Sequence, residues 1–437
     1  MKLASALAVA LLFAIAAPAC SRGGGASKDV PFVEIDPSSK STTDIAINKA
    51  QKKLRANPND AGAALALADA FLQKARETAD PSLYTKAGQL LDELSASNGG
   101  DVRVIVSQAT LALARHQFVD GLALGKRALA AAPGNEAAFG VVVDASNELG
   151  LYPAALDATQ DMVDSRPNLS SLSRVSYTRE LRGDYPGAIL AMTQAIAAAG
   201  TTTGENIAYV QVQLGNLLLT TGQVRQASTT FATALEAFPN FPAAMVGQAN
   251  VLVAQERFRA AADLLQKVID IQPLDTYAIA LGDARAAAGQ AAAAKEAYAL
   301  VKAIAKLYEA NGVNVELELA LYDADHTPGK RAVANARKAL KLRPSILGHD
   351  VLSWNLFRDG QLAEAARERV KALATGTKDP LLRFHAAAIA AANGDRAAAT
   401  ADLKVVLSEN PRFSAFLISE VKALARTLGL TMPPPAA

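Results

Sequence analysis

The chain has 437 residues, of which 51% are hydrophobic and only 5% are aromatic. This composition excludes an intrinsically disordered chain and indicates a core built mainly from small aliphatic side chains. The 44 Lys and Arg residues nearly balance the 42 Asp and Glu residues, and the resulting net charge of +2 provides no basic field of the kind that binds nucleic acid.

Residues 1–19 have the features of a secretory signal peptide. Lys2 supplies a positive start, and the apolar run from Leu3 to Ala17 is shorter than the roughly twenty residues that span a bilayer. Ala17-Pro18-Ala19 then offers small residues for cleavage, and Cys20, the only cysteine in the chain, follows directly. The pattern predicts export, with cleavage before Cys20.

A lone cysteine at the cleavage position resembles the lipobox of bacterial lipoproteins, in which the cysteine receives the lipid and becomes the new N-terminus. The resemblance implies lipidation of Cys20, and Ser21 at the next position implies an outer-membrane protein that faces the periplasm. Residues 20–43 are then a lipidated cysteine and a flexible tether that begins with Gly23-Gly24-Gly25. The alternative is plain secretion after the same site, which gives a soluble periplasmic protein with a free thiol.

A single amphipathic helix is predicted over Asp44–Ala56, and residues 44–59 form an N-terminal capping segment because no partner helix precedes them. From residue 60 to residue 412 the chain repeats a spaced pattern with a period of about 34 residues. Its first position marks a turn between two helices and falls at Ser82, His116, Gly150, Gly183, Gly222, Glu256, Gly289, Thr327, Gly360 and Gly394.

One period shows the physical logic of the pattern. Gly222 suits a helix end because glycine adopts positive φ without steric cost. Ala227 and Ala234 follow on one face of the next helix, where small side chains let helices approach closely. Pro239 comes after that helix, which it cannot continue. Two periods are longer, through the segments Thr201–Gly204 and Lys302–Asn311.

Two close-packed antiparallel helices in each period of about 34 residues resemble the tetratricopeptide repeat. The resemblance implies an all-α superhelical solenoid of antiparallel helix pairs, with about ten units over residues 60–412. Residues 413–437 would add a C-terminal capping helix and a proline-rich tail. The alternative is an irregular bundle of alanine-rich helices, which has no physical reason to keep the phase of the pattern.

The sequence shows no constellation of catalytic residues. Its four histidines do not have metal-ligand spacing, and the motifs of phosphate loops, nucleophile elbows and zinc-binding helices are missing. We therefore predict no catalytic residue, no metal site and no cofactor, and we expect the protein not to be an enzyme. The alternative is an enzyme whose site lies in the two inserted segments.

In tetratricopeptide arrays the first helices line a concave groove that receives a partner, so the resemblance implies which side chains contact it. Amides at Asn216 and Asn250 could bond an extended backbone, and aromatic side chains are enriched at binding hot spots. The alternatives are a solvated wall for the polar residues and packing for the aromatic ones. The candidates are Asp144, Asn147, Tyr177, Glu180, Tyr209, Asn216, Asn250, Asp283, Trp354, Phe357 and Arg358.

These expectations combine into a lipid-anchored scaffold of the cell envelope that binds a protein partner in its groove, as an accessory of an export or assembly machine. The membrane is reached through the lipid, nucleic acid is not a partner, and the oligomeric state stays open. The alternative is a polymer-binding scaffold in polysaccharide export, because Tyr177 and Tyr209 among acidic groups would suit sugars.

Overall fold

The computed structural model describes residues 30–39, 41–200 and 204–436. Within these ranges the chain forms 22 helices and no strand, which confirms the predicted all-α fold class. The signal peptide, Cys20 and the first part of the tether lie outside the described residues. No helix in the described part is long and apolar enough to cross a membrane.

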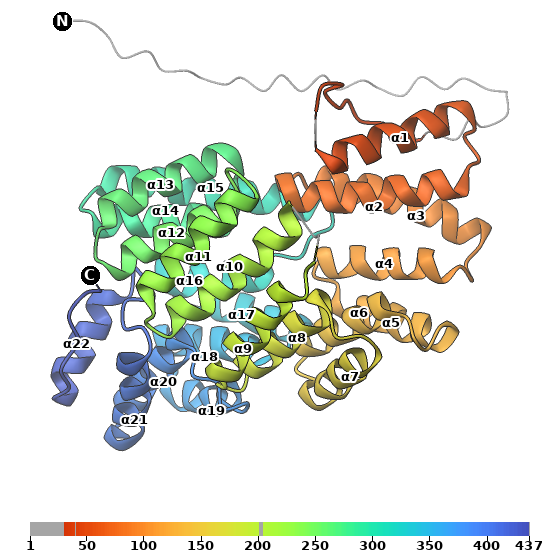
Figure 1. The fold of residues 1–437 in the computed structure, drawn as a ribbon. Helices are drawn as coiled ribbons and strands as arrows, with labels where there is room; N and C mark the ends of the chain where they lie inside the picture. The colour runs from red at the N-terminus through yellow and green to blue at the C-terminus, as the bar shows by residue number, and fades with distance from the viewer. Residues whose placement is uncertain (1–29, 40, 201–203, 437) are drawn as a thin grey trace, which may run out of the picture.

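The helices follow one another as antiparallel pairs between two single helices, α1 (Thr42–Ala56) and α22 (Ile418–Leu428). Figure 1 shows them stacked side by side along the chain. The ten pairs are α2 (Ala61–Thr78) with α3 (Ser82–Ser97), α4 (Val102–Ala114) with α5 (Phe118–Ala131), α6 (Glu136–Glu148) with α7 (Tyr152–Ser165), α8 (Leu169–Glu180) with α9 (Tyr185–Ala197), α10 (Glu205–Thr220) with α11 (Val224–Ala237), α12 (Pro242–Ala254) with α13 (Phe258–Ile271), α14 (Asp275–Ala287) with α15 (Ala291–Ala310), α16 (Glu316–His326) with α17 (Lys330–Leu342), α18 (Ile346–Arg358) with α19 (Leu362–Ala372), and α20 (Pro380–Ala392) with α21 (Arg396–Ser408).

The turns between paired helices adopt the conformation that the glycine pattern predicts. Gly150 and Gly222, for example, have φ values of 70° and 71°. His116 and Glu256 occupy the same position with φ values of 55° and 56°. A residue with a side chain adopts this left-handed conformation at a cost of about 1–2 kcal/mol. These two positions therefore carry side chains that contribute something a glycine cannot.

Alanine packs the pairs together, as the composition indicates. Ala227 and Ala234 are fully buried on the inner face of α11, and Phe231 fills the space between them. The small side chains bring neighbouring helices close, while one large side chain in a unit occupies the remaining volume. A chain with few aromatic residues can thus build a continuous core along the stack.

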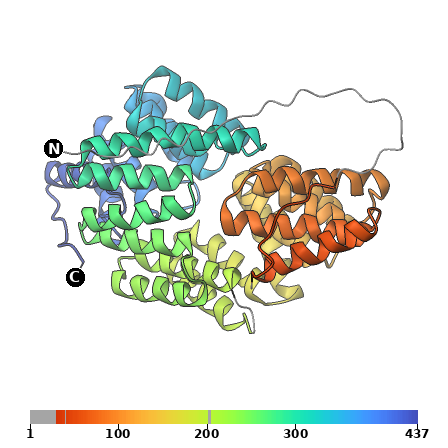
Figure 2. The ribbon, with the colours of Figure 1, turned by 90° about the horizontal axis from the view of Figure 1, so that it is seen from above.

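The superhelix is wound so tightly that its second turn rests on its first. The backbone N–H of Asn314 donates a 3.0 Å hydrogen bond to the carbonyl of Arg115, and His116 Nδ1 lies 2.7 Å from the carbonyl of Asn314, 198 positions away. Farther along, the Tyr152 hydroxyl accepts a 2.7 Å bond from the backbone N–H of Ile346, 194 positions away. Seen from above in Figure 2, the chain winds round until the teal helices lie beside the orange ones. This line of contacts, here called the seam, joins the turns at His116, Gly150, Gly183 and Gly222 to the segments at Asn314, Pro344, Gly376 and Glu409.

The second inserted segment has a structural role at the start of the seam. Helix α15 has 20 residues, and its last turn reaches the first unit of the stack. The Tyr308 hydroxyl donates a 2.8 Å bond to the carbonyl of Ala79, and the Thr85 hydroxyl donates a 2.9 Å bond to Asn311 Oδ1. The longer period at Lys302–Asn311 is thus explained by contact between the two superhelical turns.

Both ends of the described chain are covered by short segments. Gln51 on α1 bonds the backbone of Val33 in both directions, with 2.7 Å to its N–H and 3.1 Å to its carbonyl. The predicted tether over residues 20–43 therefore includes a docked part around Val33. At the other end, Arg412 donates hydrogen bonds of 2.9 and 3.2 Å to the carbonyls of Pro433 and Pro434. The proline-rich tail is folded back onto the stack.

Candidate functional site

Two cavities lie among the first helices of the units. The first has a volume of about 560 Å³ and is here called the N-terminal chamber; its walls include Arg76, Asp144, Arg174, Tyr177, Glu180 and Tyr209. The second has a volume of about 520 Å³ and is here called the C-terminal chamber; its walls include Asn216, Asn250, Asp283, Tyr322, His326 and Asp379. Both volumes fall in the range of pockets that bind small ligands, about 300–1,000 Å³.

Helix α10 forms a wall of both chambers. Tyr209 and Gln213 line the N-terminal chamber, and Asn216 and Thr220 line the C-terminal one. The chambers are therefore neighbours along the inner wall of the superhelix. Seven of the eleven predicted contact residues line one chamber or the other: Asp144, Tyr177, Glu180, Tyr209, Asn216, Asn250 and Asp283.

The arginines of the N-terminal chamber are already paired. Arg174 forms a bidentate ion pair with Asp144, at 2.9 Å and 2.6 Å. Arg76 lies 2.9 Å from Glu205, the first residue of α10. Neither arginine was among the predicted residues, because a single period of the pattern gives no sign of a pair that joins distant helices. Their charges are thus not available to neutralise a further carboxylate.

Glu180 is the unpaired carboxylate of this chamber, since its side chain forms no hydrogen bond and no ion pair with the described residues. Burial, together with the charge of Asp379, raises the pKa of Glu180 to about 7. Burial also raises the pKa of Asp379. At neutral pH the Glu180 carboxyl is therefore divided between its protonated and its ionised form.

Replacing Glu180 with glutamine is expected to stabilise the protein above pH 7. Between its ordinary pKa of 4.5 and the folded value of about 7, the folded state keeps a proton that the unfolded chain releases. The stabilising contribution of Glu180 to the free energy of unfolding is fully present below pH 4.5 and is lost as the pH rises through about 7. The resulting change in the free energy of unfolding is about 3 kcal/mol at most. Urea unfolding at pH 5 and pH 8 measures it, with Glu236→Gln on the exposed face of α11 as the control. Parallel pH profiles for wild type and Glu180→Gln would contradict the raised pKa.

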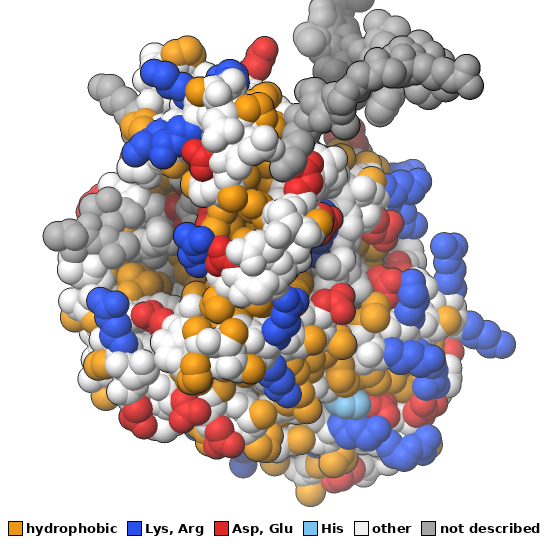
Figure 3. Space-filling model, turned by 90° about the vertical axis from the view of Figure 1, so that its right-hand side faces the viewer, with side chains coloured by type: hydrophobic (Ala, Val, Ile, Leu, Met, Phe, Trp, Pro, Cys, Tyr) orange, Lys and Arg blue, Asp and Glu red, His pale blue; other side chains and the backbone are white. Residues whose placement is uncertain are grey.

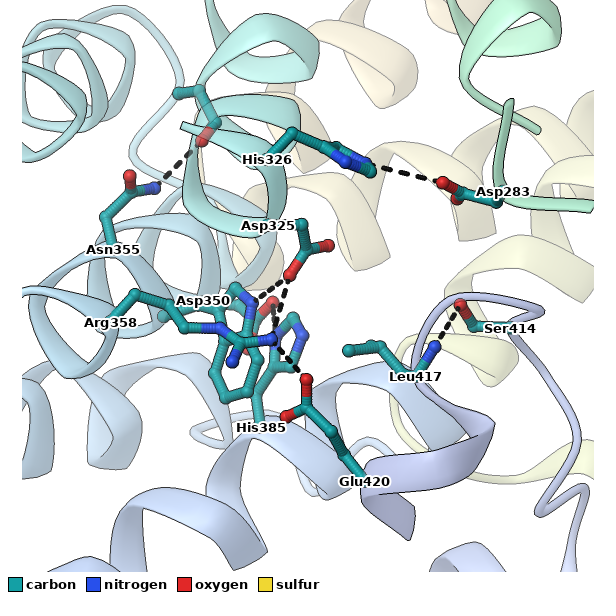
Figure 4. Close-up of polar contacts among 12 residues, drawn as sticks. Asp283, Asp325, His326, Asp350, Asn355, Arg358, His385, Ser414, Leu417 and Glu420 are labelled. Atoms are coloured by element: carbon teal, nitrogen blue, oxygen red, sulfur yellow. Dashed lines mark hydrogen bonds and ion pairs between the residues drawn. The ribbon is translucent and has the colours of Figure 1, made fainter. Parts of the chain in front are cut away.

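The C-terminal chamber presents free amides beside an aromatic cluster. The side chains of Asn216 and Asn250 form no hydrogen bond with the described residues, although both line the cavity. Asp283 accepts a 2.8 Å bond from the Tyr298 hydroxyl and lies 3.4 Å from His326 Nε2, as Figure 4 shows for the histidine. The ring of His326 packs against three aromatic rings at centroid distances of 4.4, 4.6 and 4.7 Å, those of Tyr298, Tyr322 and Phe416.

The structure corrects the expectation that Trp354 contacts a partner. Trp354 is completely buried, its ring stacks on His385 at 4.0 Å, and its indole N–H donates a 2.8 Å bond to Asp325. Phe357 stacks on the indole at 5.0 Å. Arg358 lies over the same ring and pairs with Glu420 at 2.8 Å, a contact visible in Figure 4. Trp354 is therefore a packing residue, whereas Phe357 and Arg358 are half-buried beside it and stay predicted contact residues.

Asn147 also lies away from the chambers. It is only 3% exposed, and both polar atoms of its side chain are buried without a hydrogen-bond partner. A buried amide in this state costs about 1–3 kcal/mol. The groove position predicted for Asn147 is therefore a position inside the packed stack.

Two further observations, on surface charge and on metal-binding groups, bear on function. On the face drawn in Figure 3, acidic and basic side chains are interspersed, as the near-zero net charge predicts. In the described part of the chain, no three His, Cys, Asp or Glu side chains are grouped so that they could hold a metal ion.

Comparison with known proteins identifies the repeat. Residues 212–276, from α10 to the start of α14, match the family model described as tetratricopeptide repeat. The chain thus contains tetratricopeptide repeats, and the same helix pair recurs from α2 to α21. No curated protein matches the sequence.

The chain is also similar to solved structures, two of which are described as tetratricopeptide-repeat proteins. A protein of Thermus thermophilus has 20% identity and a TM-score of 0.37, over 43% of this chain and 99% of its own. YrrB, described as having an unusual peptide-binding site, has 18% identity and a TM-score of 0.29, over 42% of this chain and 92% of its own. The Cut9–Hcn1 tetramer has 16% identity and a TM-score of 0.40, over 87% of this chain and 67% of its own.

Proposed function

We propose that the protein is a scaffold of the cell envelope, anchored by lipid on Cys20, that binds a segment of a partner protein inside its superhelix. Repeats of this kind typically serve as non-catalytic interaction scaffolds. The observation that carries the proposal is the pair of unpartnered amides at Asn216 and Asn250 on successive first helices of one chamber. Each amide offers both a donor and an acceptor to an extended backbone.

The closed seam limits the kind of partner that fits. The C-terminal chamber, with a volume of about 520 Å³, is lined by side chains of both superhelical turns, so its shape depends on the seam, whereas the N-terminal chamber of about 560 Å³ lies within the first turn. Cavities of this size accept a ligand of a few residues. The proposed partner therefore contributes a narrow extended segment, such as a terminus or a loop, to an export or assembly machine.

Partner capture tests the site. The double variant Asn216→Ala with Asn250→Ala is expected to lose the proteins that crosslink to the wild type in the native envelope. Each lost amide hydrogen bond corresponds to about 1 kcal/mol, so the pair lowers affinity by about tenfold or more. Gln194→Ala, an exposed amide on α9, is the matched control. Unchanged crosslinking in the double variant would refute the site.

The lipid anchor has a separate test. Cys20→Ser is expected to move the protein from the membrane fraction to the soluble fraction and to abolish incorporation of labelled fatty acid. A protein that stays in the membrane fraction without label would contradict anchoring through this cysteine. Plain secretion predicts a soluble protein both with and without the substitution.

A polymer-binding scaffold is the second candidate, because Tyr177 and Tyr209 line the same chamber. Aromatic faces and polar groups of this kind suit sugars. This function predicts that immobilised envelope polysaccharide retains the wild type and releases Tyr209→Ala. Tyr209 is 44% exposed, so its removal leaves the core intact.

A further inference from the structure

The N-terminal helix α1 presents three lysines on the face that points away from the stack. Ile47 and Leu54 on its inner face are buried in the core, whereas Lys49, Lys52 and Lys53 are exposed. Residues three and four positions apart lie on one side of a helix, so the three ammonium groups form one patch, here called the basic face. Figure 1 shows α1 at the outer end of the stack, with α2 beneath it.

No acidic group of the described chain neutralises the basic face. None of its three lysines forms an ion pair with the residues that the structure describes. The only acidic residue of α1, Asp44, is buried and lies 2.7 Å from Lys74. Two further acids, Glu34 and Asp36, line a pocket together with Arg55, so Arg55 is not counted in the basic face. A chain with a net charge of only +2 thus gathers three unpaired positive charges on one helix.

The path of the N-terminal segment brings the basic face close to the predicted lipid anchor. Val30 and Leu54 line one pocket, so Val30 lies beside the C-terminal half of α1, which also carries the three lysines. Ten residues, 20–29, connect Cys20 to Val30. A chain of ten residues spans at most about 36 Å even when it is fully extended. A lipid on Cys20 would therefore keep α1 within that distance of a membrane surface.

An exposed apolar side chain accompanies the lysines. Ile45 is 54% exposed and lies one helical turn before Lys49 on the same face. Helices that lie in a membrane interface combine lysines, which attract anionic headgroups, with apolar side chains that enter the boundary of the acyl chains. An acidic protein or polymer would neutralise the lysines but leave the isoleucine in water. The basic face therefore fits a lipid surface better than a water-soluble polyanion.

We propose that the basic face of α1 is a docking surface for the headgroups of anionic phospholipids, which holds the N-terminal end of the stack against the membrane. The biological setting rests on the lipid anchor of the proposed function, whereas the attraction to anionic headgroups does not need the lipid. An acyl anchor and a basic patch together give a more stable attachment than either alone. The basic face is thus the second attachment signal of this chain.

Vesicle flotation tests the surface without an acyl chain. The protein is the mature chain, residues 20–437 after the predicted cleavage, with Cys20→Ser. We expect it to float with vesicles of phosphatidylcholine and phosphatidylglycerol at low salt, where screening is weak, and not with vesicles of phosphatidylcholine alone. Replacing Lys49, Lys52 and Lys53 with glutamine should weaken this partition about a hundredfold, because each lysine near an anionic surface contributes about fivefold.

A matched variant separates the basic face from attraction by the whole protein. Replacing Lys267, Lys341 and Lys404 with glutamine makes the same change in net charge at exposed positions of α13, α17 and α21. This control should bind the phosphatidylglycerol vesicles as the parent chain does. The urea unfolding transition of each variant checks that it is folded.

A fluorescent probe tests which face touches the vesicle. Cys20 is the only cysteine, so the Cys20→Ser chain accepts one new cysteine for labelling with a nitrobenzoxadiazole dye. Ile45→Cys places the dye on the basic face, and Val370→Cys, at a position that is 65% exposed on α19, is the control. We expect the emission to rise and shift to the blue on phosphatidylglycerol vesicles for Ile45→Cys alone.

Several outcomes overturn the docking surface. They are equal partition of the basic-face variant and its control, equal partition into vesicles with and without phosphatidylglycerol, and an equal response of the two dye positions. Retention on immobilised polyglutamate through the three lysines, without vesicle binding, assigns the face to an acidic polymer instead. If the surface fails while Cys20→Ser still releases the protein from the membrane fraction, the lipid anchor stands. If the surface binds vesicles while labelled fatty acid never enters the protein, the anchor fails and the surface stands.

Discussion

Replacing Arg343 with methionine is expected to lower the free energy of unfolding by about 3–5 kcal/mol. The Arg343 side chain is only 12% exposed and binds two carboxylates, Glu148 at 3.0 and 2.6 Å and Glu318 at 2.8 Å. Glu148 belongs to the first superhelical turn, and Glu318 and Arg343 belong to the second. Removing the guanidinium leaves both carboxylates partly buried without their counter-ion, and it breaks an ion pair across the seam.

Urea unfolding measures this loss against a matched control. Arg337→Met removes a pair with Glu364 within the second superhelical turn, where the arginine is 45% exposed, and it should cost no more than about 1 kcal/mol. Adding Glu148→Gln and Glu318→Gln to the Arg343 variant should restore much of the lost stability, because no unpaired charge remains. Equal losses in the Arg343 and Arg337 variants would show that the contact across the seam does not hold in solution.

The local repeat could be predicted from the sequence because its cause is local. A turn residue with positive φ, small residues on one helix face and a terminating proline recur within every 34 residues or so. The structure has its pairs where these signals place them, and Gly150 and Gly222 have the left-handed φ that the pattern implies. The positions six residues before each turn residue, here called the groove column, follow from the same phase. Asp144, Asn216 and Asp283 belong to this column, and all three line chambers.

The seam could not be predicted, because the small rotation between successive units leaves no trace in the sequence until it accumulates over a whole superhelical turn. One signal was nevertheless present. His116 and Glu256 interrupt the run of glycines at the turn position, and both contact the second superhelical turn. His116 lies 2.7 Å from the carbonyl of Asn314, and Glu256 pairs with Arg412 and Lys422 at 2.7 and 2.8 Å. A departure from the repeat marked a contact between distant units.

Near the end of the stack, a position that faces a chamber in earlier units is buried, as Trp354 shows. It occupies the same column as Asn216 and Asn250, yet it belongs to a core cluster with Leu417 and Val421. The segment after α21 folds back over the inner wall of the last units, so the column is covered there. The column faces a chamber only where no terminal segment lies on it, and the repeat pattern alone does not contain that information.

Replacing Gly222 with alanine is expected to open the seam. The residue has a φ of 71°, and an added Cβ would lie 2.7 Å from the carbonyl oxygen of Glu409, which is backbone and cannot rotate away. Gly360→Ala is the matched control, because its φ is 79° and nothing lies within 4 Å of the added atom. Both variants incur the cost of a left-handed alanine, about 1–2 kcal/mol. Gly222→Ala adds the cost of the clash, about 1–3 kcal/mol.

Small-angle X-ray scattering distinguishes the two variants by shape as well as by stability. If the clash separates the superhelical turns, the radius of gyration rises in Gly222→Ala and stays at the wild-type value in Gly360→Ala. An open seam also separates the walls of the C-terminal chamber, which come from both superhelical turns. Gly222→Ala should therefore weaken the binding of an extended segment, although Gly222 itself does not line that chamber. Identical scattering and equal stability of the two variants would mean that the two superhelical turns are not in contact in solution, and the C-terminal chamber would then be part of an open groove.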